Sequence, residues 1–231
     1  GKISGAATNI FSVGSGEENL GVAIAASWQD RKFGSDNIET GGAWDIDGNE
    51  ARLEELEQRR YIISRERTGV GINIDYLPSE NSKTYLRTLY SEFADSEVRE
   101  GLAVEFADPI LVGERADGEA IRSLKARTDT QTISSVVVGG ETRVDEWLFS
   151  AQAGLSRATE KDPGGIAGAD FESEFENLGY ASTVSPSAIG GSELFDFANY
   201  ELAEIEWEKV SSKDEDKNIR FDISRDYTAG Y

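Results

Sequence analysis

The side chains of this sequence that could do chemistry are carboxylates, aromatic rings and arginines. None of the 231 residues is cysteine or histidine, which excludes disulfides, thiolate or imidazole metal sites, cysteine nucleophiles and histidine triads. The 44 acidic and 23 basic residues give a net charge of −21. This charge argues against nucleic acid as a partner.

The carboxylates supply two candidate chemistries. Residues 45–50 (Asp-Ile-Asp-Gly-Asn-Glu) alternate oxygen-bearing side chains beside a glycine, as calcium loops do, but the glutamate at the twelfth position of an EF-hand is missing. A solvated turn is the better interpretation. A glycosidase needs a pair of carboxylates, and nothing in the sequence singles out such a pair. We therefore expect no enzymatic activity, no metal site and no cofactor.

The elements that would position these side chains are β-strands. Between residues 68 and 76 the even positions are Thr, Val, Ile, Ile and Tyr, and the odd ones are Gly, Gly, Asn and Asp, which is the period of a strand with one apolar face. Nine residues at about 3.3 Å each, tilted by roughly 45°, cover the hydrocarbon thickness of a bilayer. An apolar face outward and a polar face inward is the porin pattern, and a soluble β-hairpin is the alternative.

The same pattern predicts seven strands, at residues 3–12, 20–32, 61–77, 83–93, 120–138, 143–158 and 219–227. Short links are expected at 14–19, 78–82 and 139–142. Long extracellular loops are expected at 33–59, 95–119 and 160–217, with a helix-prone part at 50–60. Alternating tight turns and long loops are typical of outer-membrane barrels.

Seven strands leave two unpaired edges, which lipid does not tolerate. We therefore predict an all-β fold in which residues 1–231 form one partial barrel domain. It is an antiparallel up-and-down transmembrane β-barrel segment, about seven strands of a larger barrel.

Residues 60–95 resemble the barrel of TonB-dependent outer-membrane receptors of proteobacteria. The likeness rests on a charged Tyr-x-x-x-Arg-Glu-Arg-x-Gly start, a strand closing in Asp-Tyr-x-Pro, and Tyr-Leu-Arg-Thr-Leu-Tyr-Ser-x-Phe. Residues 21–31 and 130–141 resemble the same group. The resemblance implies an outer-membrane location in contact with lipid. It also implies a small-molecule ligand, a siderophore or a carbohydrate, taken up with energy from TonB through a plug domain that is not recognisable in this sequence.

By the same resemblance, ligand contacts are expected from loop aromatics and from two arginines on the polar strand face. Aromatic faces near carboxylates suit sugars or chelate rims. The alternative for each ring is packing within the loops, and the alternative for the arginines is pairing with carboxylates on neighbouring strands. The candidates are Phe33, Trp44, Arg65, Arg67, Phe171, Phe175, Tyr180, Phe195, Phe197, Tyr200 and Trp207.

A soluble secreted all-β module that binds glycan or calcium through acidic loops is the alternative function. The two functions differ in what covers the apolar strand face. The soluble module predicts that other parts of the protein cover it, whereas the receptor predicts that it faces lipid. The side chains that distinguish them are Val70, Ile72, Ile74, Trp147 and Phe149.

Overall fold

The computed structural model describes residues 1–226, and its fold is all-β. Seven strands form the wall of the sheet: β1 (Lys2–Phe11), β2 (Leu20–Glu39), β4 (Glu50–Ser79), β5 (Ser82–Ile110), β6 (Ala116–Val144), β7 (Trp147–Ala181) and β9 (Glu201–Arg225). Two short strands, β3 (Trp44–Asp47) and β8 (Ser187–Ile189), and two 3-10 turns, η1 (Ser192–Phe195) and η2 (Phe197–Asn199), lie in the connections.

The wall strands are antiparallel neighbours in chain order, which makes the sheet an up-and-down meander. β3 pairs only with β4, and β8 only with β7. Within residues 1–226, β1 and β9 pair with no further strand, so the sheet is open. The prediction of an all-β, antiparallel up-and-down fold is confirmed.

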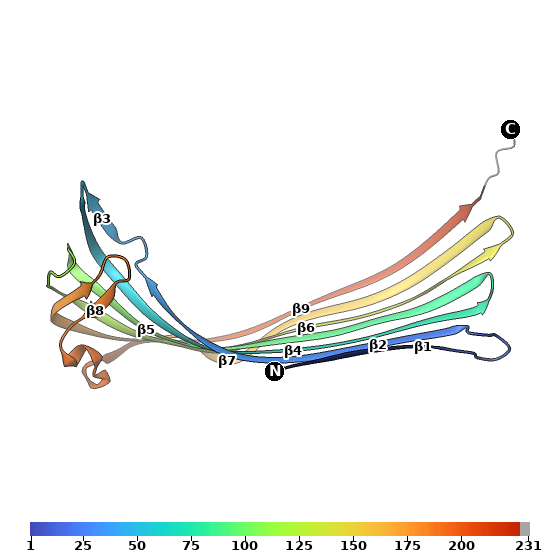
Figure 1. Ribbon diagram of the computed structural model, residues 1–231, viewed down its shortest axis with the longest axis horizontal. Coiled ribbons are helices and arrows are strands. Elements are labelled where there is room, and N and C mark those ends of the chain that lie inside the picture. The colour runs from blue at the N-terminus through green and yellow to red at the C-terminus, as the bar shows by residue number, and fades with distance from the viewer. Residues whose placement is uncertain (227–231) are drawn as a thin grey trace.

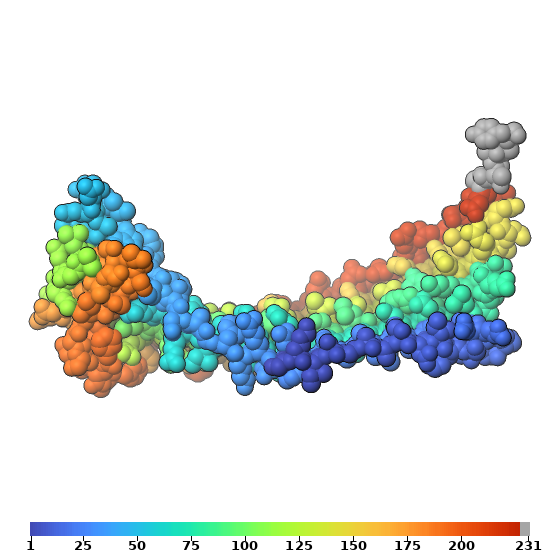
Figure 2. Space-filling view, in the orientation of Figure 1, coloured from blue at the N-terminus to red at the C-terminus, as the bar shows by residue number. Residues whose placement is uncertain are grey.

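The sheet is a single layer that bends along its length, so that its two ends rise on the same side (Figure 1). The space-filling view shows the concave side of the sheet between the raised ends (Figure 2). The hairpin turns β4–β5 and β6–β7 lie at one end, and β3 and β8 lie at the other (Figure 1). In the described part of the chain, no helix is long and apolar enough to cross a membrane.

The prediction that residues 33–59, 95–119 and 160–217 are long loops is wrong for most of their length. These segments extend the wall strands and pair residue by residue with their neighbours. The remaining connections are residues 40–49, 111–115 and 182–200, which include β3 and β8. In these extensions charged residues lie on both sheet faces and are mixed with apolar ones such as Leu56 and Val104. This mixture interrupts the two-residue hydrophobic period by which a strand is detected.

The helical tendency of residues 50–60 is also overridden, because this segment is the first part of β4. Its charged side chains are held by cross-strand pairs such as Arg59 with Glu39. The expected alternation of short and long links is weaker than predicted as well. The link 111–115 at one end is shorter than the link 12–19 at the other.

The third hairpin turn lies later in the chain than predicted. β6 continues through Gly139 and Gly140, and the chain reverses after Val144, where Asp145 takes a positive φ of 52°. The two glycines are needed for close packing, since a Cβ at Gly139 would lie 2.5 Å from the ring of Tyr85. Residues 219–225 of the last predicted strand fall within β9, Asp226 follows the end of β9, and Tyr227 lies outside the described residues.

The register gives the wall two different faces. Residues directly opposite one another on successive strands form a rung. The rung Ile24, Ile72, Thr88, Val136 and Leu155 belongs to what we call the apolar face. The next rung, Ala25, Gly71, Leu89, Ser135 and Ser156, belongs to the polar face, which also carries Arg65, Asn73, Asp75 and Gln152.

No second layer of described residues covers the apolar face. Of the five side chains that distinguish the two functions, Val70 is 36% exposed, Trp147 40% and Phe149 39%, while Ile72 and Ile74 are half-buried. Ile24 and Leu155 are each 47% exposed. Large apolar side chains are therefore uncovered over the half of the sheet that ends in the hairpin turns.

Candidate functional site

The buried core of the described chain lies at the other end of the sheet. The rung Leu56, Val104 and Ala120 on β4, β5 and β6 has no exposed surface. Residues 178–200, which we call the covering segment, lie across this rung and contribute buried Leu178, Tyr180, Leu194 and Tyr200. The core thus joins three strands to the connection between β7 and β9.

The covering segment is held by an arginine of β6, by an arginine of the link before β6 and by a hydrogen bond of its own. Arg122 on β6 donates from Nη2 to the main-chain oxygen of Phe195 (3.1 Å), and its guanidinium carbon lies 5.1 Å from the ring centroid of Tyr200. Arg115 donates from Nη1 to the oxygen of Ile189 (3.1 Å). Tyr200 donates from Oη to the oxygen of Leu194 (2.7 Å), which closes the 3-10 turns on themselves.

Six of the predicted aromatic residues meet around this core. Burial raises the pKa of the hydroxyls of Tyr180 and Tyr200. Because both tyrosines are buried, they contribute packing to the cluster. The ring pairs, with their centroid separations, are Trp44 with Tyr180 (5.9 Å), Phe171 with Phe197 (4.9 Å) and Phe175 with Tyr200 (5.5 Å).

Three predicted rings are open to solvent. Phe195 is 56% exposed and Phe197 is 52% exposed, and both lie on the covering segment. Trp207 is 71% exposed and lies on β9 opposite Ile166, away from that segment. Phe195 and Phe197 are therefore the rings that the structure places together and leaves accessible.

The predicted arginines lie elsewhere, on the polar face near the middle of the sheet. Arg65 forms an ion pair with Asp95 (3.1 Å) and lies 5.3 Å from the ring centroid of Phe33. Arg67 lies over the ring of Phe93 at 4.7 Å. The covering segment packs on the opposite face, so the structure does not join these arginines to the aromatic cluster.

A rung of four glutamates was not predicted from the sequence. Glu55, Glu105, Glu119 and Glu174 lie directly opposite one another on β4, β5, β6 and β7. Burial raises the pKa of Glu105, and the charges of Glu55 and Glu119 raise it further. The four residues are distant in sequence, and only the strand register brings them together, so no local motif could have indicated them.

The residues predicted as a solvated turn form one. Residues 44–47 and 50–53 pair as a tight hairpin, with Gly48 at a φ of +60°. Glu50 pairs with Arg52 (3.1 Å). Among the described residues, no group of three or more acidic side chains is arranged to hold a metal ion.

The site combines accessible rings on the covering segment, a packed core beneath them and a glutamate rung on the opposite face. No protein-family model, no curated protein and no solved structure matches this chain.

Proposed function

We propose that this chain forms part of the wall of a closed β-barrel in an outer membrane and acts in the receptor-mediated uptake of a scarce nutrient. The observation that carries the proposal is the uncovered apolar face of a one-layer antiparallel sheet. In water such a face would be buried under a second layer, whereas in lipid it is the surface that contacts acyl chains. Closure into a barrel satisfies the open edges of β1 and β9.

The boundary of the proposed lipid belt is marked by Trp28. Its ring lies on the apolar face, and its Nε1 donates to Oε1 of Glu66 (2.8 Å). Beyond it the same face carries the charged rung of Asp30 and Glu66. An indole with its ring in the apolar belt and its N–H toward polar groups is the arrangement favoured at a membrane interface.

The strands are much longer than one membrane crossing requires. β4 has 30 residues and β7 has 35, whereas a tilted transmembrane strand needs about 9–11. The far half of the sheet, which carries charges on both faces and the buried core, would therefore stand in water. This half would hold the nutrient site, with Phe195, Phe197 and Trp207 as its accessible rings.

The ligand class follows from the resemblance to TonB-dependent receptors. Rings beside carboxylates suit an oligosaccharide or the rim of an iron–siderophore complex. In this proposal TonB supplies the energy through a plug domain, and the chain performs no catalysis. Binding assays with a panel of siderophores and oligosaccharides test the ligand. Phe195→Ala with Phe197→Ala is expected to weaken binding, and Ile46→Ala, an exposed residue of β3, serves as the control.

Cell fractionation tests the membrane location. The protein is expected in the outer-membrane fraction, released only by detergent. Its recovery in a soluble fraction without detergent would overturn the proposal. That result would favour a secreted module that binds glycan or calcium through its acidic connections.

A further inference from the structure

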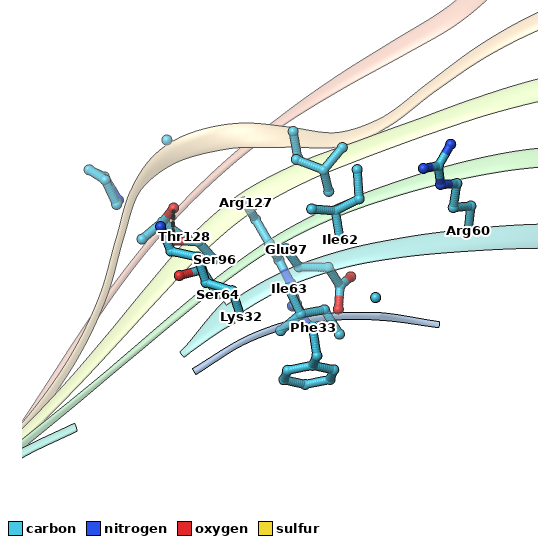
Figure 3. A pocket seen from close by; sticks show the side chains of 15 residues that line it. Lys32, Phe33, Arg60, Ile62, Ile63, Ser64, Ser96, Glu97, Arg127 and Thr128 are labelled. Carbon is cyan, nitrogen blue, oxygen red and sulfur yellow. Dashed lines mark hydrogen bonds between the residues drawn. The ribbon is translucent and has the colours of Figure 1, made fainter. Parts of the chain in front are cut away.

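A hollow of about 890 Å³ lies on the apolar face where the sheet bends (Figure 3). Its floor is the apolar rung Ile62, Val98 and Ala126, which lie opposite one another on β4, β5 and β6. Figure 3 shows Arg60 and Ile62 on one side of the strands and Phe33 on the other. Ile62 and Val98 continue the even-numbered positions of β4 and β5 that form the apolar face, so the floor of the hollow belongs to the face that carries the proposed lipid belt.

One wall of the hollow is a bulge in β7, where the pairing with β9 shifts between Asp162 and Gly165. Asp162, which is only 4% exposed, accepts a hydrogen bond from the N–H of Gly164 (2.9 Å). A Cβ at Gly165 would lie 2.5 Å from the main-chain oxygen of Ala126, so glycine permits the close approach. The bulge is thus fixed by a buried carboxylate and a glycine contact.

A polar rung borders the apolar floor. Lys32, Ser64, Ser96 and Thr128 lie opposite one another on four successive strands. The hydroxyl oxygens of Ser96 and Thr128 are 3.0 Å apart, so one donates to the other. An ammonium beside a row of hydroxyls supplies the donors that a phosphate oxygen accepts.

Three cationic residues and one carboxylate, Glu97, line the hollow. Arg127 forms an ion pair with Asp129 (3.4 Å), whereas Lys32 and Arg60 are not neutralised within the described chain. The side chains of Lys32 and Arg60 form no ion pair or hydrogen bond with any residue in 1–226, although the protein carries a net charge of −21. Asp36 and Glu100 lie opposite Arg60 in register without reaching ion-pair distance. Ile62, between the two cations along the wall, is 51% exposed. Cations next to exposed apolar surface fit an anionic amphiphile.

The hollow lies just beyond the proposed lipid belt. Lys32 follows Trp28 on β2 by about 13 Å of strand, which is the level of headgroups next to a hydrocarbon core. Basic pockets at this level bind anionic lipid headgroups. This step rests on the proposed function, because that function fixes where the bilayer lies.

We propose that the hollow binds the phosphorylated headgroup of an outer-leaflet glycolipid. The phosphate lies between Lys32 and Arg60 and accepts hydrogen bonds from the hydroxyl rung. The C–H face of the sugar packs on Ile62 and Val98. The lipid binds on the outside of the wall, at a site separate from the nutrient site on the covering segment.

The test isolates the complete protein from outer membranes in mild detergent and measures retained glycolipid by native mass spectrometry. The double variant Lys32→Gln with Arg60→Gln is compared with Arg31→Gln with Lys125→Gln. The control pair removes the same two charges from β2 and β6 on the polar face. The first variant is expected to retain roughly thirtyfold less glycolipid, since each of its two lost cations contributes about 1 kcal/mol near a membrane surface. The control is expected to match the parent protein.

A second measurement adds diphosphorylated glycolipid, the same lipid after phosphatase treatment, or inorganic phosphate. Loss of binding after phosphatase treatment supports the inference, whereas equal binding of inorganic phosphate alone overturns the assignment to a lipid headgroup. Equal retention by both double variants also overturns it. If both double variants fractionate with the outer membrane and retain equal amounts of glycolipid, the proposed function stands while this inference fails. If the parent protein does not reach the outer membrane, both the proposed function and the glycolipid site are overturned.

Discussion

The guanidinium of Arg122 on β6 lies over the ring of Tyr200, the last residue before β9, with the guanidinium carbon 5.1 Å from the ring centroid. The same guanidinium donates to the main-chain oxygen of Phe195 (3.1 Å). One side chain of the wall thus fixes both the buried end and the exposed part of the covering segment. The accessible rings Phe195 and Phe197 depend on this contact for their position.

Arg122→Met is expected to loosen the covering segment while leaving the wall intact. The substitution removes a charge-assisted hydrogen bond and a cation–π contact, together worth about 2 kcal/mol. Hydrogen exchange of residues 187–200 should accelerate by roughly tenfold or more. Lys125→Met on the same strand is the control and should leave that exchange unchanged. Equal exchange in both variants would contradict a pinning role for Arg122.

Leu56→Ala is expected to destabilise the end of the sheet that carries the core. Leu56 is fully buried in the rung with Val104 and Ala120, and truncation of a buried leucine costs about 2–5 kcal/mol. Trp44 packs on Tyr180 in this core, so its fluorescence reports the unfolding in urea. Ile62→Ala lies on the same strand and face but is 51% exposed, and it should cost far less.

Val70→Arg is expected to impair insertion into lipid vesicles. Val70 lies on the apolar face, where an arginine near the bilayer midplane costs about 2–4 kcal/mol. Ser91→Arg is the matched control, because Ser91 lies on the polar face next to Gly69 on β4. The folded fraction is measured by the heat-dependent shift in gel mobility. Similar folding of the two variants would contradict a lipid-facing role for the apolar face.

Glu105→Gln is expected to stabilise the protein at neutral pH. The pKa of Glu105 is raised by burial and by the charges of Glu55 and Glu119, so the folded state favours the protonated form. Its stabilising contribution is therefore full below the ordinary glutamate pKa and is lost as the pH rises through the raised pKa. Removing the charge should add roughly 0.5 kcal/mol at neutral pH, the size of an unfavourable like-charge pair across a sheet.

The measurement for Glu105 is the free energy of unfolding between about pH 5 and about pH 8. The parent protein should lose more stability than Glu105→Gln as the pH rises. Glu80→Gln in the turn between β4 and β5 also removes one carboxylate and serves as the control. If Glu80→Gln reduced the loss of stability with rising pH as much as Glu105→Gln does, the glutamate rung would not be the cause of that loss.

The strand segments with one apolar face were accessible to sequence reasoning because their signal is local. Residues 68–76 alternate in type, and the structure places the even positions on one face and the odd positions on the other. The extensions of the same strands were not predicted. In residues 95–110 of β5 and 160–181 of β7, charged residues fall on both faces, so the amino-acid pattern resembles that of a loop.

The turn predicted at residues 139–142 shows why the ends of strands were also predicted wrongly. Gly139 and Gly140 suggest a reversal in the sequence, yet Tyr85 on the neighbouring strand occupies the space that a side chain there would fill. Their role is packing across strands, which only the pairing of β5 with β6 reveals. A Gly-Gly pair can thus form a turn or permit close packing between strands, and the sequence alone does not distinguish the two roles.

The sequence by itself determined an all-β chain with an apolar and a polar strand face, because side-chain alternation is a property of the extended backbone and needs no partner. The tertiary structure alone decided which side chains meet. The glutamate rung, the aromatic cluster over Leu56 and the hollow beside Lys32 each join residues from at least three strands. These clusters depend on the strand register and on one bulge in β7. Both are set by pairing and close packing between segments that are distant along the chain.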